Sequence, residues 1–228
     1  MSFNRRQFLQ GSSVVLASPF VHTAHAEPRA DIELTLALDA SGSMFDVKNE
    51  GVKNWDTQIG GHVYALGQQE VIEKLIGGRV HLRVILWSDG KVYPLVFDGL
   101  VRTEHDLVRA SVSLKNFKPS CVGTGCGGTN HGTAILRTIQ LPQMGYLRVL
   151  DISTDEATNA NFRLSIDSLR KEFSLQDGTI NALAVGLSEK GENDLKKNLC
   201  TQNGFCFRAV AWSDYAKTLT RKIITEIA

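Results

Sequence analysis

The sequence predicts an α/β fold with a doubly wound, Rossmann-like sheet of six strands, mostly parallel, one antiparallel edge strand and helices on both faces. Apolar runs of strand length alternate with amphipathic runs of helical length from residue 32 onward, which is typical of a parallel sheet. The first run, "IELTLALD", is almost continuously apolar, as expected of a strand buried on both faces. One Asp-Gly turn between strand-like runs predicts the antiparallel edge strand.

The first half of the chain supplies three of the predicted strands. Val63, Leu66, Val71 and Leu75 recur at helical spacing, and Gly77-Gly78 ends that helix. Pro94 places the third strand at an edge of the sheet, because proline cannot donate to a ladder. The elements are a strand at 32–39, a helix at 57–77, strands at 79–87 and 92–97, and helices at 103–117, capped by Thr103, and 130–141.

The second half repeats a strand–helix alternation three times. Its elements are strands at 146–154, 178–186 and 204–212, and helices at 161–176, 190–200 and 213–227, the last capped by Ser213. We find no repeat, linker or low-complexity tract, so residues 27–228 are expected to form one domain.

Residues 1–26 have the pattern of an export signal peptide. Arg5 and Arg6 precede Phe8 and Leu9, an apolar stretch follows, and "AHA" at 24–26 is a small-x-small cleavage pattern. The paired arginines resemble a twin-arginine signal; an ordinary secretory signal is the alternative. We therefore expect a bacterial protein that is periplasmic or secreted.

Charge and hydropathy exclude some partners. The whole chain carries a net charge of +1, with 25 basic and 24 acidic residues. Cleavage after Ala26 removes two arginines and leaves −1, so a nucleic-acid partner is not expected. No apolar run reaches the roughly 18 residues of a membrane span.

Four cysteines fit an oxidising compartment. They form two close pairs, in "CVGTGC" and "CTQNGFC", and four cysteines allow three pairings. The simplest pairing joins Cys121 to Cys126 and Cys200 to Cys206. Zinc is a weaker alternative, because neither spacing is that of a zinc motif.

Polar side chains gather where predicted strands end. Asp39, Ser41 and Ser43 follow the first strand, and Asp155 follows the strand at 146–154; Thr129 precedes a helix in a glycine-rich loop. Ligand sites of doubly wound sheets lie at the carboxyl ends of strands. Two carboxylates and three hydroxyls form an all-oxygen set that suits a hard divalent cation such as Mg²⁺, with Mn²⁺ or Ca²⁺ as alternatives.

This pattern resembles the metal-ion-dependent adhesion site of von Willebrand factor A (VWA) domains, and the chain is similar to an uncharacterised group of exported bacterial VWA proteins. The resemblance covers nearly all of the mature chain. It implies that Ser41 and Ser43 ligate the metal directly, and that Thr129 does so directly in one state and through water in another. Asp39 and Asp155 would act mainly through water. It also implies metal-dependent binding of a protein partner that supplies a Glu or Asp carboxylate, without catalysis.

Two features depart from that family. Glu156 stands where glycine usually follows the second aspartate, and it could ligate the metal, block a partner or point to solvent. The long segment at 45–56 is expected to be a solvated loop. Alternatively it shapes partner choice, with Trp55 as an anchor.

Three other interpretations stay open. "DASGS" could be an ordinary polar turn. A metal-dependent hydrolase or phosphoryl-transfer enzyme would need a second acid or a placed histidine, and position 41 is serine; His131 is more simply a residue at the start of a helix. A scaffold that binds through another face is the third.

Overall fold

The chain folds around a six-stranded sheet with the strand order β5-β4-β1-β6-β7-β8. The computed structural model describes residues 29–45, 47–48, 52–89, 94–119 and 127–228. Five strands run parallel, and β5 pairs antiparallel with β4 at one edge. The predicted fold class is therefore confirmed. The strands of the sheet are β1 (Ala30–Asp39), β4 (Val80–Trp87), β5 (Phe97–Leu100), β6 (Gly145–Thr154), β7 (Gly178–Val185) and β8 (Cys206–Ala209).

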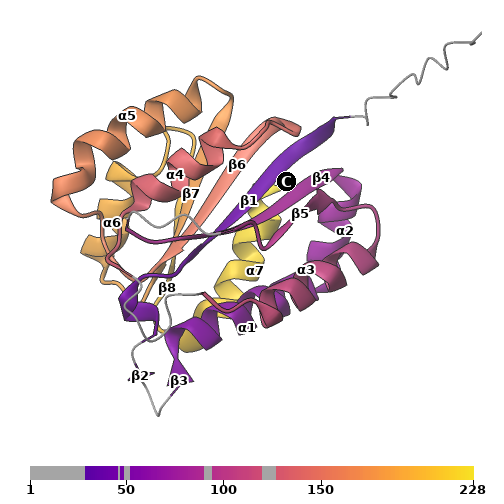
Figure 1. The fold of residues 1–228 in the computed structure, drawn as a ribbon, viewed down its shortest axis with the longest axis horizontal. Helices are drawn as coiled ribbons and strands as arrows, with labels where there is room; N and C mark the ends of the chain where they lie inside the picture. The colour runs from indigo at the N-terminus through magenta and orange to yellow at the C-terminus, as the bar shows by residue number, and fades with distance from the viewer. Residues whose placement is uncertain (1–28, 46, 49–51, 90–93, 120–126) are drawn as a thin grey trace, which may run out of the picture.

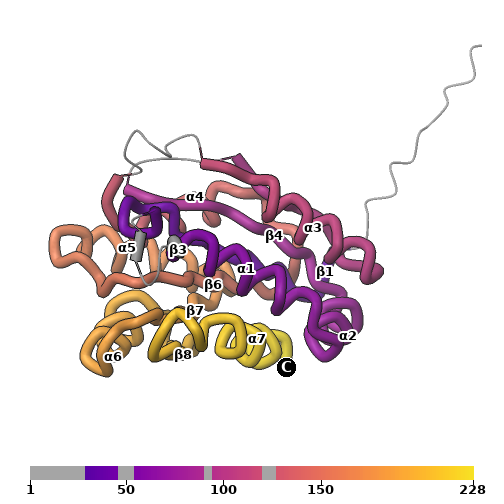
Figure 2. The backbone as a smooth tube through the Cα atoms, turned by 90° about the horizontal axis from the view of Figure 1, so that it is seen from below, coloured from indigo at the N-terminus to yellow at the C-terminus, as the bar shows by residue number. Residues whose placement is uncertain are grey.

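Helices cover both faces of the sheet (Figure 1). One face packs against α1 (Asn54–Leu66), α2 (Gln69–Gly77), α3 (Glu104–Asn116) and α7 (Tyr215–Glu226). The other packs against α4 (His131–Gln140), α5 (Arg163–Ser174) and α6 (Glu189–Asn198). Figure 2 shows α1 and α7 running side by side.

Alternate residues of β1 enter the two cores. Leu34, Leu36 and Leu38 pack with α1 and α7, whereas Ala37 packs with α4 and α5. A strand whose side chains alternate between two apolar layers has to be apolar throughout. This explains the continuous apolar run, and it fixes the direction in which β1 delivers Asp39.

An ionic cluster lies buried near the amino ends of the strands. Glu33 of β1 is only 1% exposed, and its carboxylate accepts hydrogen bonds from Arg83 of β4 and Arg148 of β6. The distances from Arg83 Nη1 and Arg148 Nη2 to Glu33 Oε1 are 2.9 and 3.1 Å. The backbone N–H of Met144 donates to the other carboxylate oxygen at 2.7 Å. Three neighbouring strands are thus joined by one carboxylate.

Several predicted boundaries were wrong. The helix at 57–77 is two helices, because the chain turns at Gly67 and extended Gln68; glycine weakens a helix interior. The edge strand begins at Phe97, after Pro94, whose missing N–H cannot enter the ladder. Ser213 does not cap the last helix, because Trp212–Asp214 forms a 3-10 turn first.

Further short elements were not predicted. The segment expected to be a loop contains a two-stranded antiparallel ribbon, β2 (Val47–Lys48) with β3 (Val52–Lys53). The 3-10 turns are η1 (Gly42–Met44), η2 (Ala160–Phe162) and η3 (Trp212–Asp214). Among the described residues no helix is both long and apolar enough to cross a membrane.

Candidate metal site

The turn after β1 is organised by the carboxylate of Asp39. This side chain is fully buried, and its Oδ1 accepts from the backbone N–H of Ser41 at 2.8 Å. Its Oδ2 accepts from the hydroxyl of Thr154 at the end of β6, at 3.2 Å. An aspartate that bonds to the backbone two residues later forms a tight local turn. Asp39 therefore shapes the turn that presents Ser41 and Ser43.

The two serines meet the second carboxylate. Ser41 Oγ lies 3.2 Å from Ser43 Oγ, and the hydroxyl of Ser43 donates to Asp155 Oδ1 at 3.1 Å. Asp155 directly follows β6, the strand beside β1. Because neighbouring parallel strands end at the same edge, residues 112 positions apart in sequence lie in contact. Asp39, Ser41, Ser43 and Asp155 thus form one connected group.

The loop that carries Thr129 adjoins this group. The backbone N–H of Gly42 donates to the carbonyl oxygen of Gly127 at 2.9 Å, which holds the loop beside the Ser41–Ser43 turn. Thr129 is 6% exposed, and its hydroxyl oxygen is buried without a hydrogen-bond partner among the described residues. An unpaired buried hydroxyl is costly. A cation ligated by Thr129 would satisfy it, so the residues present fit a bound metal.

Burial raises the pKa of Asp39 to about 7, although its hydrogen bonds from Ser41 oppose the shift and nearby Asp155 adds to it. A second carboxylate close by disfavours ionisation of the first, and a bound cation would remove this cost. Within the described part of the chain, no group of three or more His, Cys, Asp or Glu side chains could hold a metal. The two carboxylates of this candidate site would therefore need further oxygen donors, which the hydroxyls of Ser41, Ser43 and Thr129 could supply.

The first turns of α1 hold this end of the sheet, which the sequence analysis missed. Gln58 donates from Nε2 to the carbonyl oxygen of Asp39 at 2.9 Å and accepts at Oε1 from the N–H of Asp39 at 3.1 Å. Asn54 donates from Nδ2 to Asp155 Oδ2 at 3.3 Å. Their spacing of four residues, one helical turn, is the only signal in the sequence that they share a face.

Trp55 is not the exposed anchor that the sequence suggested. It is 7% exposed and stacks on Phe45, with ring centroids 5.2 Å apart. Phe45 directly follows the turn that carries the serines. The stacked pair thus fastens that turn to α1 instead of offering a surface to a partner.

Glu156 is exposed, as one of the three alternatives predicted. Its backbone N–H donates to Thr154 Oγ1 at 3.2 Å.

Both nearby histidines are engaged in buried contacts. His131 is the first residue of α4, as predicted, and its Nε2 lies 3.2 Å from Thr154 Oγ1. His62 Nδ1 lies 2.9 Å from the carbonyl oxygen of Gln58 and 3.3 Å from the hydroxyl of Tyr215. Burial lowers the pKa of each imidazole to about 4, so both rings are neutral at neutral pH. Neither ring forms the contact with Ser41 or Ser43 that a serine nucleophile needs.

The cysteine predictions have separate outcomes. Cys121 and Cys126 lie outside the described residues. Cys200 and Cys206 are free thiols in the structure, which differs from the predicted disulfide. The Cys200 thiol donates to the carbonyl oxygen of Phe205 at 3.3 Å, and the Cys206 thiol donates to that of Phe207 at 3.6 Å. The structure does not contain the Cys200–Cys206 disulfide, which stays a prediction for the oxidised protein.

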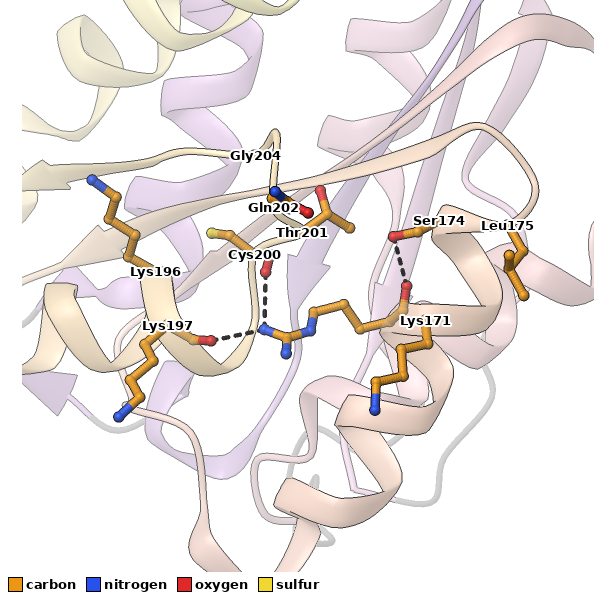
Figure 3. A pocket seen from close by; sticks show the side chains of 10 residues that line it. Lys171, Ser174, Leu175, Lys196, Lys197, Cys200, Thr201, Gln202 and Gly204 are labelled. Carbon is orange, nitrogen blue, oxygen red and sulfur yellow. Dashed lines mark hydrogen bonds between the residues drawn. The ribbon is translucent and has the colours of Figure 1, made fainter.

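A sizeable cavity lies away from the carboxyl ends of the strands. It has a volume of about 740 Å³ and is bounded by the C-terminal ends of α5 and α6 and by residues 200–204. Figure 3 shows Lys171, Lys196 and Lys197 extending from its walls in different directions. Arg170 is occupied by the carbonyl oxygens of Lys197 and Cys200. The charged groups that line this cavity do not converge on one point. The carboxyl ends of the strands therefore remain the better candidate site.

Residues 29–228 match a family that is described as a protein of unknown function, DUF1194. The chain belongs to this DUF1194 family. No curated protein matches it.

Solved structures similar to this DUF1194 protein show that it has the VWA fold. Proximal thread matrix protein 1 from the mussel byssus, with a zinc-occupied metal-ion-dependent adhesion site, is 14% identical with a TM-score of 0.56, covering 87% of this chain and 46% of that one. The PilB minor pilin from Streptococcus sanguinis is 12% identical with a TM-score of 0.61, over 89% and 63%. The VWA domain of SpRpn10 is 10% identical with a TM-score of 0.52, over 82% and 93%.

The first two of these proteins are longer than this chain. The DUF1194 chain spans about half the length of the mussel protein. At these identities the likeness concerns the fold alone, and it confirms the predicted VWA-type fold.

Proposed function

We propose that this DUF1194 protein is an exported VWA domain that binds a divalent cation and uses it to bind a protein partner, without chemical turnover. Ser41, Ser43 and Thr129 would ligate the cation directly. Asp39 and Asp155 would act mainly through water and balance its charge. The buried hydroxyl of Thr129, which lacks a partner among the described residues, is the observation that carries this proposal.

The chemistry of the donors favours a small hard cation. Serine and threonine hydroxyls are neutral oxygen ligands, so a bound Mg²⁺ keeps most of its positive charge and retains several waters. Such an ion attracts an external carboxylate to an open position. We infer that a Glu or Asp side chain of the partner fills it. The mussel protein, whose adhesion site holds zinc, supports the binding of a divalent cation at such a site.

The direct test is calorimetric titration of Mg²⁺ and Mn²⁺ into the wild type and the variants Asp39→Ala and Ser41→Ala. Both variants should fold, as judged by circular dichroism, and should lose cation binding. Ser168→Ala is a matched control, because Ser168 is an exposed serine on α5. Unchanged binding of both ions by both variants would contradict the proposal.

The partner can be sought by capture from a periplasmic extract with and without EDTA. We expect a protein that the wild type retains in Mg²⁺ and releases in EDTA, and that Asp39→Ala does not retain. Capture that survives EDTA would instead favour a scaffold that binds through another face. Turnover of an ester or phosphate substrate that disappears with Asp39→Ala would favour an enzyme.

A further inference from the structure

The side chains of Asn54 and Gln58 reach both carboxylates of the candidate metal site. Asn54 is 3% exposed and Gln58 is fully buried. They lie one helical turn apart at the start of α1, on the face turned toward the ends of β1 and β6. Polar side chains are rarely buried unless their hydrogen bonds are specific. We propose that these two amides are positioning residues for the cation, an inference that rests on the proposed function.

Gln58 takes the place of a missing strand partner. The pairing of β1 with β6 ends at Leu38 and Ser153. One residue later, the N–H and C=O of Asp39 bond to the two ends of the Gln58 amide, at 3.1 and 2.9 Å. An amide side chain offers a donor and an acceptor together, as a peptide group does. Gln58 thereby continues the ladder and fixes the direction in which Asp39 leaves β1.

Asn54 acts on the second carboxylate. Ser43 donates to one oxygen of Asp155, and Asn54 donates to the other at 3.3 Å. Both oxygens are therefore oriented before any cation arrives. Groups that orient the ligands of a metal commonly change its affinity by about 10- to 100-fold. We expect losses of that size when either amide is replaced by an apolar side chain.

The test is Mg²⁺ titration of Gln58→Leu, Asn54→Leu and Asn54→Asp, with Gln69→Leu and Asn203→Asp as controls. Gln69 is an exposed glutamine on α2, and Asn203 is an exposed asparagine before β8. The two leucine variants at positions 54 and 58 should weaken Mg²⁺ binding by about tenfold or more. The controls should bind as the wild type does.

The Asn54→Asp variant distinguishes a role of Asn54 in positioning the cation from a role in fold stability alone. A carboxylate placed 3.3 Å from Asp155 raises the energy of the metal-free protein, because like charges repel. A bound cation relieves that repulsion. Asn54→Asp should therefore bind Mg²⁺ more tightly than the wild type and gain a larger increase in Tm from it, whereas Asn54→Leu should do the opposite. A role in stability alone would lower the Tm of both without separating their affinities.

The outcomes distinguish this inference from the proposed function. Mg²⁺ binding that Asp39→Ala abolishes, but that the three variants at positions 54 and 58 retain within about twofold, would overturn the inference alone. A wild type that binds neither Mg²⁺ nor Mn²⁺ overturns both. If Gln58→Leu does not fold, the opposite shifts expected for the two Asn54 variants decide the matter.

Discussion

We expect the buried imidazole of His62 to destabilise the folded protein in acid, and replacing it with asparagine should remove this contribution. His62 is 1% exposed and lies between α1 and α7. Its Nδ1 donates to the carbonyl oxygen of Gln58, a bond that the amide nitrogen of asparagine can reproduce. Burial lowers the pKa of His62 from 6.5 to about 4; nearby Asp151 opposes this shift and Lys222 adds to it.

The magnitude follows from these two pKa values. Well above pH 6.5 the ring is neutral in both the folded and the unfolded chain, so it adds no pH dependence there. As the pH falls from 6.5 toward 4, the unfolded chain takes up a proton that the folded chain does not, and stability is lost. The full loss is about 3 kcal/mol, and about 2 kcal/mol is lost between about pH 7.5 and about pH 5.

The assay is urea unfolding of the wild type and of His62→Asn in EDTA at these two pH values. Burial raises the pKa of Asp39 to about 7 and that of Glu226 to about 8, and these carboxyls favour the folded state as the pH falls. Subtracting the free energy of unfolding of His62→Asn from that of the wild type at the same pH cancels such shared contributions. The free energy of unfolding of the wild type minus that of His62→Asn should be about 2 kcal/mol smaller at the lower pH. His105→Asn, at an exposed histidine on α3, is the control. A difference that stays constant to within about 0.5 kcal/mol between the two pH values would refute the reasoning.

Two further predictions concern the amino ends of the strands. Glu33→Ala removes the buried carboxylate that Arg83 and Arg148 share, although Arg83 keeps its pair with the partly exposed Asp98, so we expect a loss of about 3 kcal/mol in the free energy of unfolding. Asp31→Ala, which breaks an exposed pair, should cost less than about 1 kcal/mol; equal losses in urea unfolding would count against the cluster. Gly145→Ala places a Cβ 2.4 Å from the backbone nitrogen of Glu33, so it should lower Tm sharply or prevent folding. Gly60→Ala on α1, which meets no atom within 4 Å, should leave Tm unchanged or raise it, and similar Tm values for the two variants would contradict this account.

The sequence predicted the fold class because its signals are local. The continuous apolar run of β1 reports burial on two faces, and this can be read without knowing what covers each face. Asp39, Ser41 and Ser43 lie within five residues, so their turn could also be predicted. Predicted boundaries were wrong where the local preference for helix is weak. At Gly67, for example, the helix predicted at 57–77 divides into α1 and α2.

The tertiary structure alone decided which residues meet at the strand ends. Ser43 and Asp155 touch across 112 positions because β1 and β6 are parallel neighbours, and strand order is a property of the whole sheet. Asn54 and Gln58 carry no metal motif, and nothing near them in sequence shows that α1 packs over the ends of β1 and β6. Their roles depend on packing between distant segments, whereas the residues of the turn after β1 are set by the chemistry of one short stretch of chain.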